Sequence, residues 1–196
     1  MRIAVYASGN GSNFQAIAEA IASKQVDATI CFLFCDNPKA YVIERAKKLG
    51  VPFKVFSPRN YENRAAYERE LLNQLELHAV DLIVLAGYMR IIGPTLLRAY
   101  ANRILNIHPS LLPSFPGKSS IQDAFDANEK ETGVTVHVVD AGVDTGPIIA
   151  QEKVAILPED TVDSLEDRIH QVEHRLFPQV IQKVIENNTI KRVNKN

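Results

Sequence analysis

The sequence predicts an α/β protein with a Rossmann-like, doubly wound and mostly parallel sheet, helices on both faces, and a mixed or antiparallel C-terminal part. Three observations point to this fold class. Short apolar runs alternate with amphipathic segments over the first half of the chain, as parallel strands and their crossover helices do. A glycine-rich turn at residues 8–13 separates the first apolar run from the first amphipathic segment. The second half is less regular, with two apolar runs joined by the loop 140–147.

Five apolar runs in the first half are predicted strands, because β-branched and aromatic residues are frequent in them and turn residues flank them. They are residues 3–7, 28–34, 53–56, 82–86 and 104–107. Residues 134–139 and 148–154 are two further predicted strands. Right-handed crossovers between the parallel strands would place ligands at the carboxyl ends of those strands.

Amphipathic segments between these runs are predicted helices. The first follows Ser12 and Gln15, which are spaced as a capping box. The second and third span residues 40–49 and 61–77. A long pattern over residues 161–187 predicts the last helix, which Pro178 should kink or split.

Composition favours one soluble domain over residues 1–196, because 196 residues with 46% hydrophobic content can bury one sizeable core. Lys and Arg total 22 against 23 acidic residues, so no basic field favours nucleic acid or an anionic membrane. No secretory signal pattern or membrane-length apolar stretch is visible. We expect a cytoplasmic protein, with a frayed polar tail at residues 191–196.

Cys31 and Cys35 lie four residues apart in the apolar run CFLFC. An extended strand would send both to the same face at a separation of roughly ten ångströms. A disulfide or redox pair is disfavoured at that distance. We therefore predict two buried packing cysteines.

The turn Ser8-Gly9-Asn10-Gly11-Ser12-Asn13 follows the first predicted strand and opens the first predicted helix. Unpaired backbone N–H groups and the helix dipole make such a turn an anion site. Phe14 stands where the dinucleotide fingerprint needs a small residue, and no Lys-Ser or Lys-Thr pair follows. A single phosphomonoester fits better than NAD or ATP. The alternative is a plain glycine turn between strand and helix.

Asn106 and His108 lie two residues apart at the end of an apolar run, followed by Pro109 and Pro113. Residues i and i+2 of an extended segment point the same way. An amide and an imidazole directed at one oxygen could stabilise the charge that develops when a nucleophile adds to a carbonyl. The alternative is that both side chains only satisfy backbone groups of the turn.

Four motifs resemble those of the phosphoribosylglycinamide formyltransferases, a branch of the folate-dependent formyltransferases. They are SGNGSN at 8–13, AGYMRII at 86–92, NIHPSLLPSFPG at 106–117 and DTGPI at 144–148. The resemblance covers nearly the whole chain. It implies formyl transfer from the co-substrate 10-formyltetrahydrofolate to the free amine of glycinamide ribonucleotide, in purine biosynthesis. Direct attack by that amine requires no protein nucleophile.

The resemblance assigns catalysis to Asn106, His108 and Asp144. Asn106 and His108 would stabilise the tetrahedral oxyanion. Asp144 would lie beside His108, favour its protonated form and relay protons through water. On sequence alone, residues 144–147 could simply be a turn.

For the acceptor, the resemblance places the phosphate at the turn and the ribose and amide at three other segments. Glu173 would bind the ribose. The implied acceptor residues are Gly11, Ser12, Asn13, Met89, Pro109, His170, Gln171, Val172 and Glu173. Without the resemblance, His170, Glu173 and Phe177 are only one side of a helix, for which a solvated face is the favoured interpretation.

For the folate, the resemblance implies backbone pairing with the flat pterin edge inside a pocket with apolar walls. The implied residues are Met89, Arg90, Ile91, Ile92, Asn106, Asp140, Ala141, Gly142, Val143 and Asp144. Arg64 matches a position near the glutamate tail, although an arginine on an exposed helix is usually a surface charge. Residues 1–100 would thus form a phosphate-binding half and residues 101–196 a catalytic and folate-binding half.

The sequence does not decide the role of His137 or of the segment 118–121. His137 matches a position near the site, yet in the alternating run VTVHVV it could equally be a hydrogen-bonded core histidine. Residues 118–121, Lys-Ser-Ser-Ile, depart from relatives that carry histidines in this loop. The resemblance is compatible with a monomer or a homodimer, and it implies no metal.

Four other functions compete with formyl transfer to glycinamide ribonucleotide. A formyltetrahydrofolate hydrolase shares the Asn, His and Asp but usually has a regulatory domain ahead of the catalytic one. Methionyl-tRNA formyltransferase normally adds a C-terminal RNA-binding domain. A non-catalytic folate or nucleotide sensor could share the scaffold, because fold alone does not prove turnover. A metal enzyme is disfavoured by five scattered histidines without HExxH or paired-Cys spacing.

Overall fold

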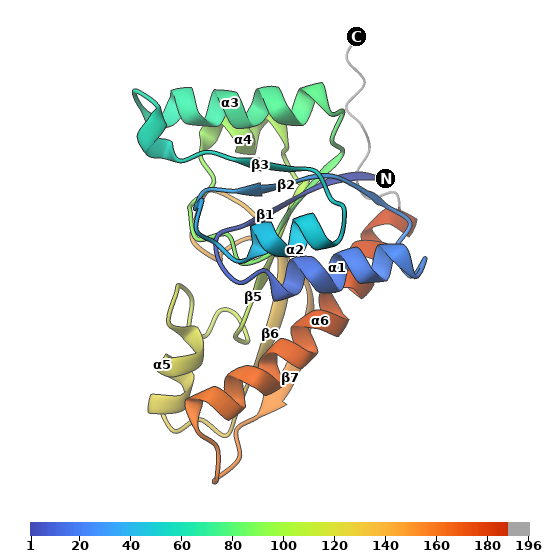
Figure 1. Cartoon of the computed structure of the whole chain (residues 1–196). Helices are drawn as coiled ribbons and strands as arrows, with labels where there is room; N and C mark the ends of the chain where they lie inside the picture. The colour runs from blue at the N-terminus through green and yellow to red at the C-terminus, as the bar shows by residue number, and fades with distance from the viewer. Residues whose placement is uncertain (188–196) are drawn as a thin grey trace.

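A computed structural model describes residues 1–187. Those residues form one seven-stranded sheet in the order β3-β2-β1-β4-β5-β6-β7 (Figure 1). The strands are β1 (Arg2–Ala7), β2 (Thr29–Cys35), β3 (Phe53–Val55), β4 (Leu82–Leu85), β5 (Ile104–His108), β6 (Glu131–Val138) and β7 (Ile148–Ala155). Pairing is parallel from β3 to β5, and β6 and β7 are antiparallel. The predicted strands, their mixed arrangement and the α/β fold class are confirmed.

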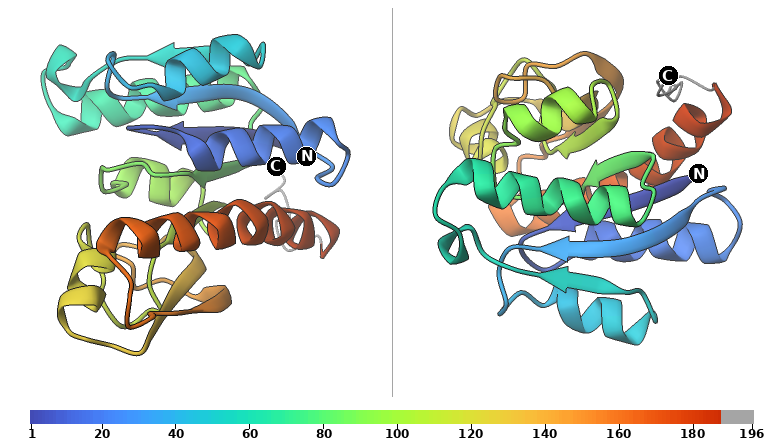
Figure 2. Two further views of the ribbon diagram at one scale, coloured as in Figure 1. Left: turned by 60° about the horizontal axis from the view of Figure 1, so that its bottom comes forward. Right: turned by 90° about the horizontal axis from the view of Figure 1, so that it is seen from above.

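Helices cover both faces of the sheet (Figures 1 and 2). One face carries α1 (Ser12–Ala22), α2 (Val42–Lys48) and α6 (Val162–Glu186), and the other carries α3 (Arg64–Leu77) and α4 (Pro94–Ala99). A short helix, α5 (Ser120–Asp126), contacts α6. A 3-10 turn, η1 (Pro58–Asn60), precedes α3. Three short elements, α4, α5 and η1, were not among the predicted helices.

Two hydrophobic cores hold these layers together. Ile3 and Val5 of β1 face the core beneath α1, α2 and α6. Ala4 and Tyr6 face the core beneath α3 and α4. Side chains of a strand alternate between faces, and a strand buried on both faces reads as a continuous apolar run. The second core is rich in aromatic rings, and the rings of Tyr6 and Phe34 lie 5.0 Å apart.

The cysteines are both buried and free, as predicted, but they do not share a face of β2. Cys35 lies in the core beneath α1 and α2, whereas Cys31 lies in the core beneath α3. The register of β1 against β2 skips Cys31, which is therefore the extra residue of a β-bulge. A one-residue insertion reverses the alternation of side chains, and this reversal makes the shared-face prediction wrong.

The predicted capping box is wrong, and so is the predicted alternative of a last helix split at Pro178. Gly11 caps α1 in the left-handed conformation with φ 79°, without a side-chain cap. Ser12 and Gln15 are therefore inside the helix and form no capping box. Pro178 lies within α6, which continues through it to Glu186. Pro178 and its neighbours are buried against the sheet, and that packing outweighs the backbone hydrogen bond that proline removes.

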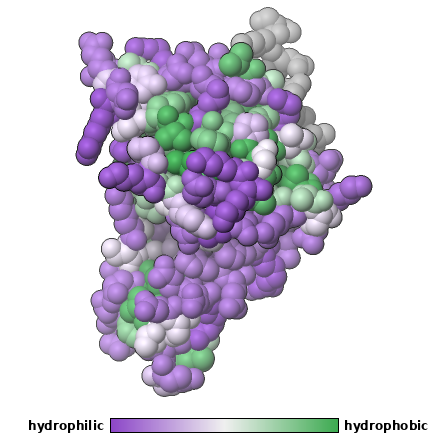
Figure 3. Space-filling model, viewed as in Figure 1, coloured by the Kyte–Doolittle hydropathy of each residue, from purple (hydrophilic) through white to green (hydrophobic). Residues whose placement is uncertain are grey.

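The face of the molecule seen in Figure 3 is mostly hydrophilic, with hydrophobic side chains gathered in its upper half. Over residues 1–187, no helix has both the length and the apolar character that a membrane crossing requires. Residues 191–196, the predicted polar tail, lie outside the described part of the chain.

Gly133→Ala should destabilise the fold, because a Cβ at this β6 position would lie 2.2 Å from the Glu152 carbonyl oxygen and 2.5 Å from Leu111 Cδ2. We expect a loss of about 1–3 kcal/mol in the free energy of unfolding, typical of overpacking. Urea unfolding measures it. Gly9→Ala is the control, because a Cβ there meets nothing within 4 Å. Equal stability of the two variants would contradict the prediction.

Candidate active site

A cleft of about 720 Å³ opens at the carboxyl ends of the parallel strands. The order of strands reverses between β1 and β4, and such a switch point is where doubly wound sheets bind ligands. The turn 8–13 follows β1 and segment 85–92 includes the end of β4, and both line the cleft. Residues of β5, α5, α6 and the loop after β6 complete the wall.

The turn after β1 has its shape because Gly11 occupies the left-handed region. A Cβ at Gly11 would lie 2.2 Å from Val42 Cγ2, so only glycine fits between this turn and α2. Gln15 N donates to the Gly11 carbonyl oxygen at 3.0 Å, which begins α1. The N-terminus of α1 therefore faces the cleft, as the sequence predicted for an anion site.

Asn106, His108 and Asp144 lie together at the carboxyl end of β5. Asn106 Nδ2 donates to Asp144 Oδ1 at 3.4 Å. His108 Nδ1 lies 3.4 Å from Asp144 Oδ2, and His108 Nε2 lies 2.9 Å from the Phe115 carbonyl oxygen, to which it donates. An imidazolium makes both contacts of His108 with N–H donors, whereas a neutral ring carries only one N–H.

His137 joins this cluster from β6, where it pairs directly with Asn106 of β5. Its Nδ1 contacts the Val138 carbonyl oxygen at 3.0 Å, which leaves Nε2 of a neutral ring to accept from Asn106 Nδ2 at 3.1 Å. His137 Nε2 also lies 3.6 Å from Asp144 Oδ1. His137 is thus both a buried histidine and a neighbour of the cluster.

Asp144 remains ionised in this cluster. Burial alone would raise its pKa, but the adjacent His137 ring, the hydrogen bond from the Gly117 backbone and the adjacent His108 ring together outweigh burial and lower the pKa. Gly117 N donates to Asp144 Oδ2 at 2.9 Å. The φ of Asp144 is 55°, a left-handed conformation uncommon for residues other than glycine.

Glu173 of α6 reaches the turn after β1. Its Oε2 accepts from Asn13 Nδ2 at 2.8 Å and lies 4.0 Å from His170 Nε2. Burial raises the pKa of Glu173, and the contacts with Asn13 and His170 only partly oppose that rise. His170 and Glu173 line the cleft. Gln171 is exposed, and Val172 packs against the core beneath α6, so neither side chain is brought into the cleft.

Segment 89–92 lines the opposite side of the cleft. Met89 N donates to Ser8 Oγ at 3.0 Å. Arg64 donates to the Ile91 carbonyl oxygen at 2.9 Å and pairs with the buried Glu68 at 2.9 Å. Arg64 itself does not line the cleft, so its role toward a folate tail stays a prediction.

The remaining predicted residues divide into two groups. Pro109, Asp140, Gly142 and Val143 line the cleft, whereas Ala141 does not. Asp140 Oδ1 accepts from Gly142 N and Thr145 Oγ1, which shapes the loop between β6 and β7. Residues 118–121, left open by the sequence, run into α5 and also line the cleft.

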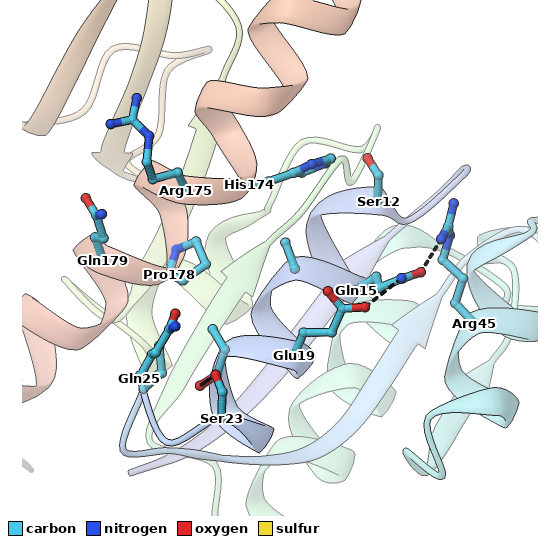
Figure 4. Close-up of a pocket in the computed structure, with 13 residues that line it drawn as sticks. Ser12, Gln15, Glu19, Ser23, Gln25, Arg45, His174, Arg175, Pro178 and Gln179 are labelled. Atoms are coloured by element: carbon cyan, nitrogen blue, oxygen red, sulfur yellow. Dashed lines mark hydrogen bonds between the residues drawn. The ribbon is translucent and has the colours of Figure 1, made fainter.

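A second hollow lies between α1 and α6 (Figure 4). Arg45 and Arg175 are its arginines, but Arg45 bonds Asn10 and Gln15, and Arg175 bonds Glu152. Both guanidinium groups therefore already have hydrogen-bond partners inside the protein. Among residues 1–187, no group of three His, Cys, Asp or Glu side chains could hold a metal ion.

Residues 1–181 match the family model described as Formyl transferase. The chain belongs to the formyl transferase family. This formyl transferase is 52% identical over 184 residues to phosphoribosylglycinamide formyltransferase of Bacillus subtilis, covering 94% of each chain. Two solved structures agree with that result. The Bacillus halodurans phosphoribosylglycinamide formyltransferase has a TM-score of 0.93 at 48% identity, covering 96% of this chain and 97% of that one. The Geobacillus kaustophilus glycinamide ribonucleotide transformylase 1 has a TM-score of 0.91 at 55% identity, covering 93% and 97%.

Glu173→Gln should stabilise the unliganded formyl transferase near neutral pH. Because the pKa of Glu173 is raised above 4.5 in the folded state, ionisation costs stability as pH rises through the unfolded and then the folded pKa. An amide of the same shape avoids that cost and still accepts from Asn13. We expect the melting temperature to rise by about 2–4 °C, with no gain below about pH 4.

Calorimetry of the wild-type protein and the variant across pH measures this effect. Glu166→Gln is the matched control, because Glu166 lies on the same helix and is 49% exposed. A lower melting temperature for Glu173→Gln near neutral pH, or an equal gain in the control, would contradict the prediction.

Proposed function

We propose that this formyl transferase moves the formyl group of 10-formyltetrahydrofolate to the amine of glycinamide ribonucleotide. One observation carries the proposal: Asn106, His108 and Asp144 meet in a single cleft between the turn 8–13 and segment 89–92. The cleft therefore combines polar side chains suited to chemistry at a carbonyl, a helix N-terminus suited to an anion, and backbone groups suited to the edge of a flat ring. Relatives that this chain matches over nearly their whole length carry the name of this activity.

The proposed reaction begins when the acceptor amine attacks the formyl carbon. A bond forms from the amine nitrogen to that carbon, and the bond from the carbon to N10 of the folate later breaks. Asn106 Nδ2–H stabilises the negative oxygen of the intermediate, together with an N–H of His108 that exchanges its protein partner for this oxygen. The amine loses one proton and N10 gains one. Asp144, ionised beside His108, orients the imidazole ring and orders the water that carries the proton.

For the acceptor, backbone N–H groups of Gly11, Ser12 and Asn13 hold the phosphate at the N-terminus of α1. Glu173 accepts a ribose hydroxyl in place of Asn13, with which it is bonded in the free protein. Within the part of the chain that the structure describes, the buried Asn13 Oδ1 has no hydrogen-bond partner, so it can accept from a ligand. Met89, Pro109 and the segment 170–173 bound the glycinamide end.

For the folate, backbone groups of Met89, Arg90, Ile91 and Ile92 pair with the pterin edge. Met89 and Ile91 are 56% and 61% exposed, so the segment offers apolar side chains to a flat ring. The loop from Asp140 through Ala141, Gly142 and Val143 to Asp144 covers the other edge. In this proposal the phosphate site belongs to residues 1–100 and the reacting groups to residues 101–196.

Several parts of the proposal rest on family resemblance rather than on contacts. They are the tail contact of Arg64, the contributions of Gln171, Val172 and Ala141, a cytoplasmic location, and a monomer or homodimer. Both proposed substrates are small molecules. The hydrolase rival remains distinguishable by experiment, because a hydrolase needs no acceptor.

We expect purified protein to convert 10-formyltetrahydrofolate to tetrahydrofolate only when glycinamide ribonucleotide is present. The conversion can be followed spectroscopically. Turnover without the acceptor would indicate a hydrolase. Binding of both compounds without turnover would indicate a sensor.

His108→Ala should lower kcat at least about a hundredfold, because it removes one oxyanion donor and the partner of Asp144. Steady-state rates with both substrates measure the loss. His78→Ala is the matched control, because His78 caps the end of α3 and its ring packs on Phe32. Full turnover by His108→Ala would overturn the catalytic assignment.

A further inference from the structure

We propose that Asp36 is a positioning residue that fixes the phosphate-binding turn and the pterin-binding segment relative to each other. The proposal rests on the proposed function for the identity of the two substrates. Asp36 does not line the cleft, whereas Ser8 and Arg90, its two partners, do. Asp36 therefore acts through those partners and touches neither substrate.

The contacts form a closed connection between the two substrate regions. Asp36 Oδ1 accepts from Ser8 Oγ at 2.6 Å, and Asp36 Oδ2 accepts from Arg90 Nε at 2.5 Å. The Ser8 hydroxyl in turn accepts from the Met89 backbone N–H at 3.0 Å. One carboxylate thus binds the turn after β1 through Ser8 and the segment after β4 through Arg90, while Ser8 binds that segment directly.

Sheet topology explains why these residues meet. Ala7 of β1 pairs with Cys35 of β2, so the next residues, Ser8 and Asp36, leave neighbouring strands at the same edge. On the other side of β1, Ser8 N donates to the Gly87 carbonyl oxygen at 3.0 Å. The contact is therefore built from three adjacent strands, and each loop contributes one partner.

Because the Asp36 carboxylate is buried, both of its partners must stay in place. The Asp36 side chain is 7% exposed, and Arg90 is the cation that pairs with it. The negative charge lies near the aromatic core, where burial first and then the charge of Asp36 contribute to raising the pKa of Tyr67 to about 12. A buried carboxylate requires a paired cation and hydrogen-bond donors. Arg90 and Ser8 are thus held in one geometry, and their loops with them.

The experiment compares KM for each substrate and kcat in wild-type protein, Asp36→Asn and Ser8→Ala. Asp36→Asn keeps the shape of the side chain but removes the charge that holds Arg90. We expect KM to rise about tenfold for glycinamide ribonucleotide and for 10-formyltetrahydrofolate, as the loss of a charge-assisted hydrogen bond predicts. We expect a smaller effect on kcat, because the reacting groups are unchanged.

Ser8→Ala keeps the ion pair of Asp36 with Arg90 and deletes only the bridging hydroxyl. It should raise both KM values less than Asp36→Asn does. The double variant should be less impaired than the two single effects added together, because both changes break one connection. If Asp36→Asn does not fold, Ser8→Ala tests the proposal by itself. Unchanged KM values of Ser8→Ala would then overturn the proposal.

Asp81→Asn is the matched control. Asp81 accepts from Arg2 N at 2.9 Å at the amino end of the sheet, away from the cleft. Its replacement can lower stability but should leave both KM values unchanged. A rise in the folate KM alone for Asp36→Asn, unchanged KM values in the folded variant, or equal KM shifts in Asp81→Asn would each overturn the proposal.

If the proposed function is wrong, the result differs from the one expected when only the role of Asp36 is wrong. In that case the wild-type protein itself would not transfer formyl to glycinamide ribonucleotide. Calorimetric titration of wild-type protein and Asp36→Asn with glycinamide ribonucleotide, and separately with tetrahydrofolate, still tests the connection without turnover. Weaker binding of both compounds to the variant supports it, and equal binding overturns it.

Discussion

The parallel pairing of β1 with both β2 and β4 is the constraint on which the site depends. It brings Ser8, Asp36 and Gly87 out of the sheet at one edge. Because the strand order reverses there, the loops that follow diverge and leave a cleft between them. The antiparallel strands then add two neighbours of the β5 side chains: β6 lies against β5 and places His137 beside Asn106, and the loop toward β7 brings Asp144 to the same point. Chemistry at a carbonyl thus depends on pairing across most of the sheet.

Buried carboxylates at this edge are stabilised to different degrees. Asp144 has enough donors around it for its pKa to fall despite burial. Glu173 has fewer, and its pKa is raised. A group poorly satisfied in the free protein is suited to exchange its partner for a ligand, whereas a well satisfied group is suited to hold a fixed charge. The difference agrees with a ribose contact for Glu173 and a permanent charge for Asp144.

The segment 89–92 is held at its two middle residues, Arg90 and Ile91, by side chains that do not themselves line the cleft. Asp36 binds it through Arg90, and Glu68 orients Arg64, which donates to the Ile91 carbonyl oxygen. Glu68 also accepts from Thr95 N at 3.2 Å and fills the space that a side chain at Gly93 would need. A site that recognises a flat ring through backbone groups needs such support, because backbone groups are positioned only as well as the segment that carries them.

The sequence by itself determined the fold class, the strands and the family, because apolar periodicity and turn chemistry are local and the NIHPSLLP and SGNGSN motifs are specific. It could not place Cys31, because a bulge in β2 reverses the alternation of side chains. It could not decide whether Pro178 splits the last helix, because burial against the sheet decides that α6 continues through this residue. Tertiary structure alone revealed Asp36 and Glu68, whose sequence neighbourhoods resemble ordinary loop and helix. It also separated His170 and Glu173 from Gln171 and Val172. Each of these depends on which distant strand or helix packs alongside, and no local pattern encodes that.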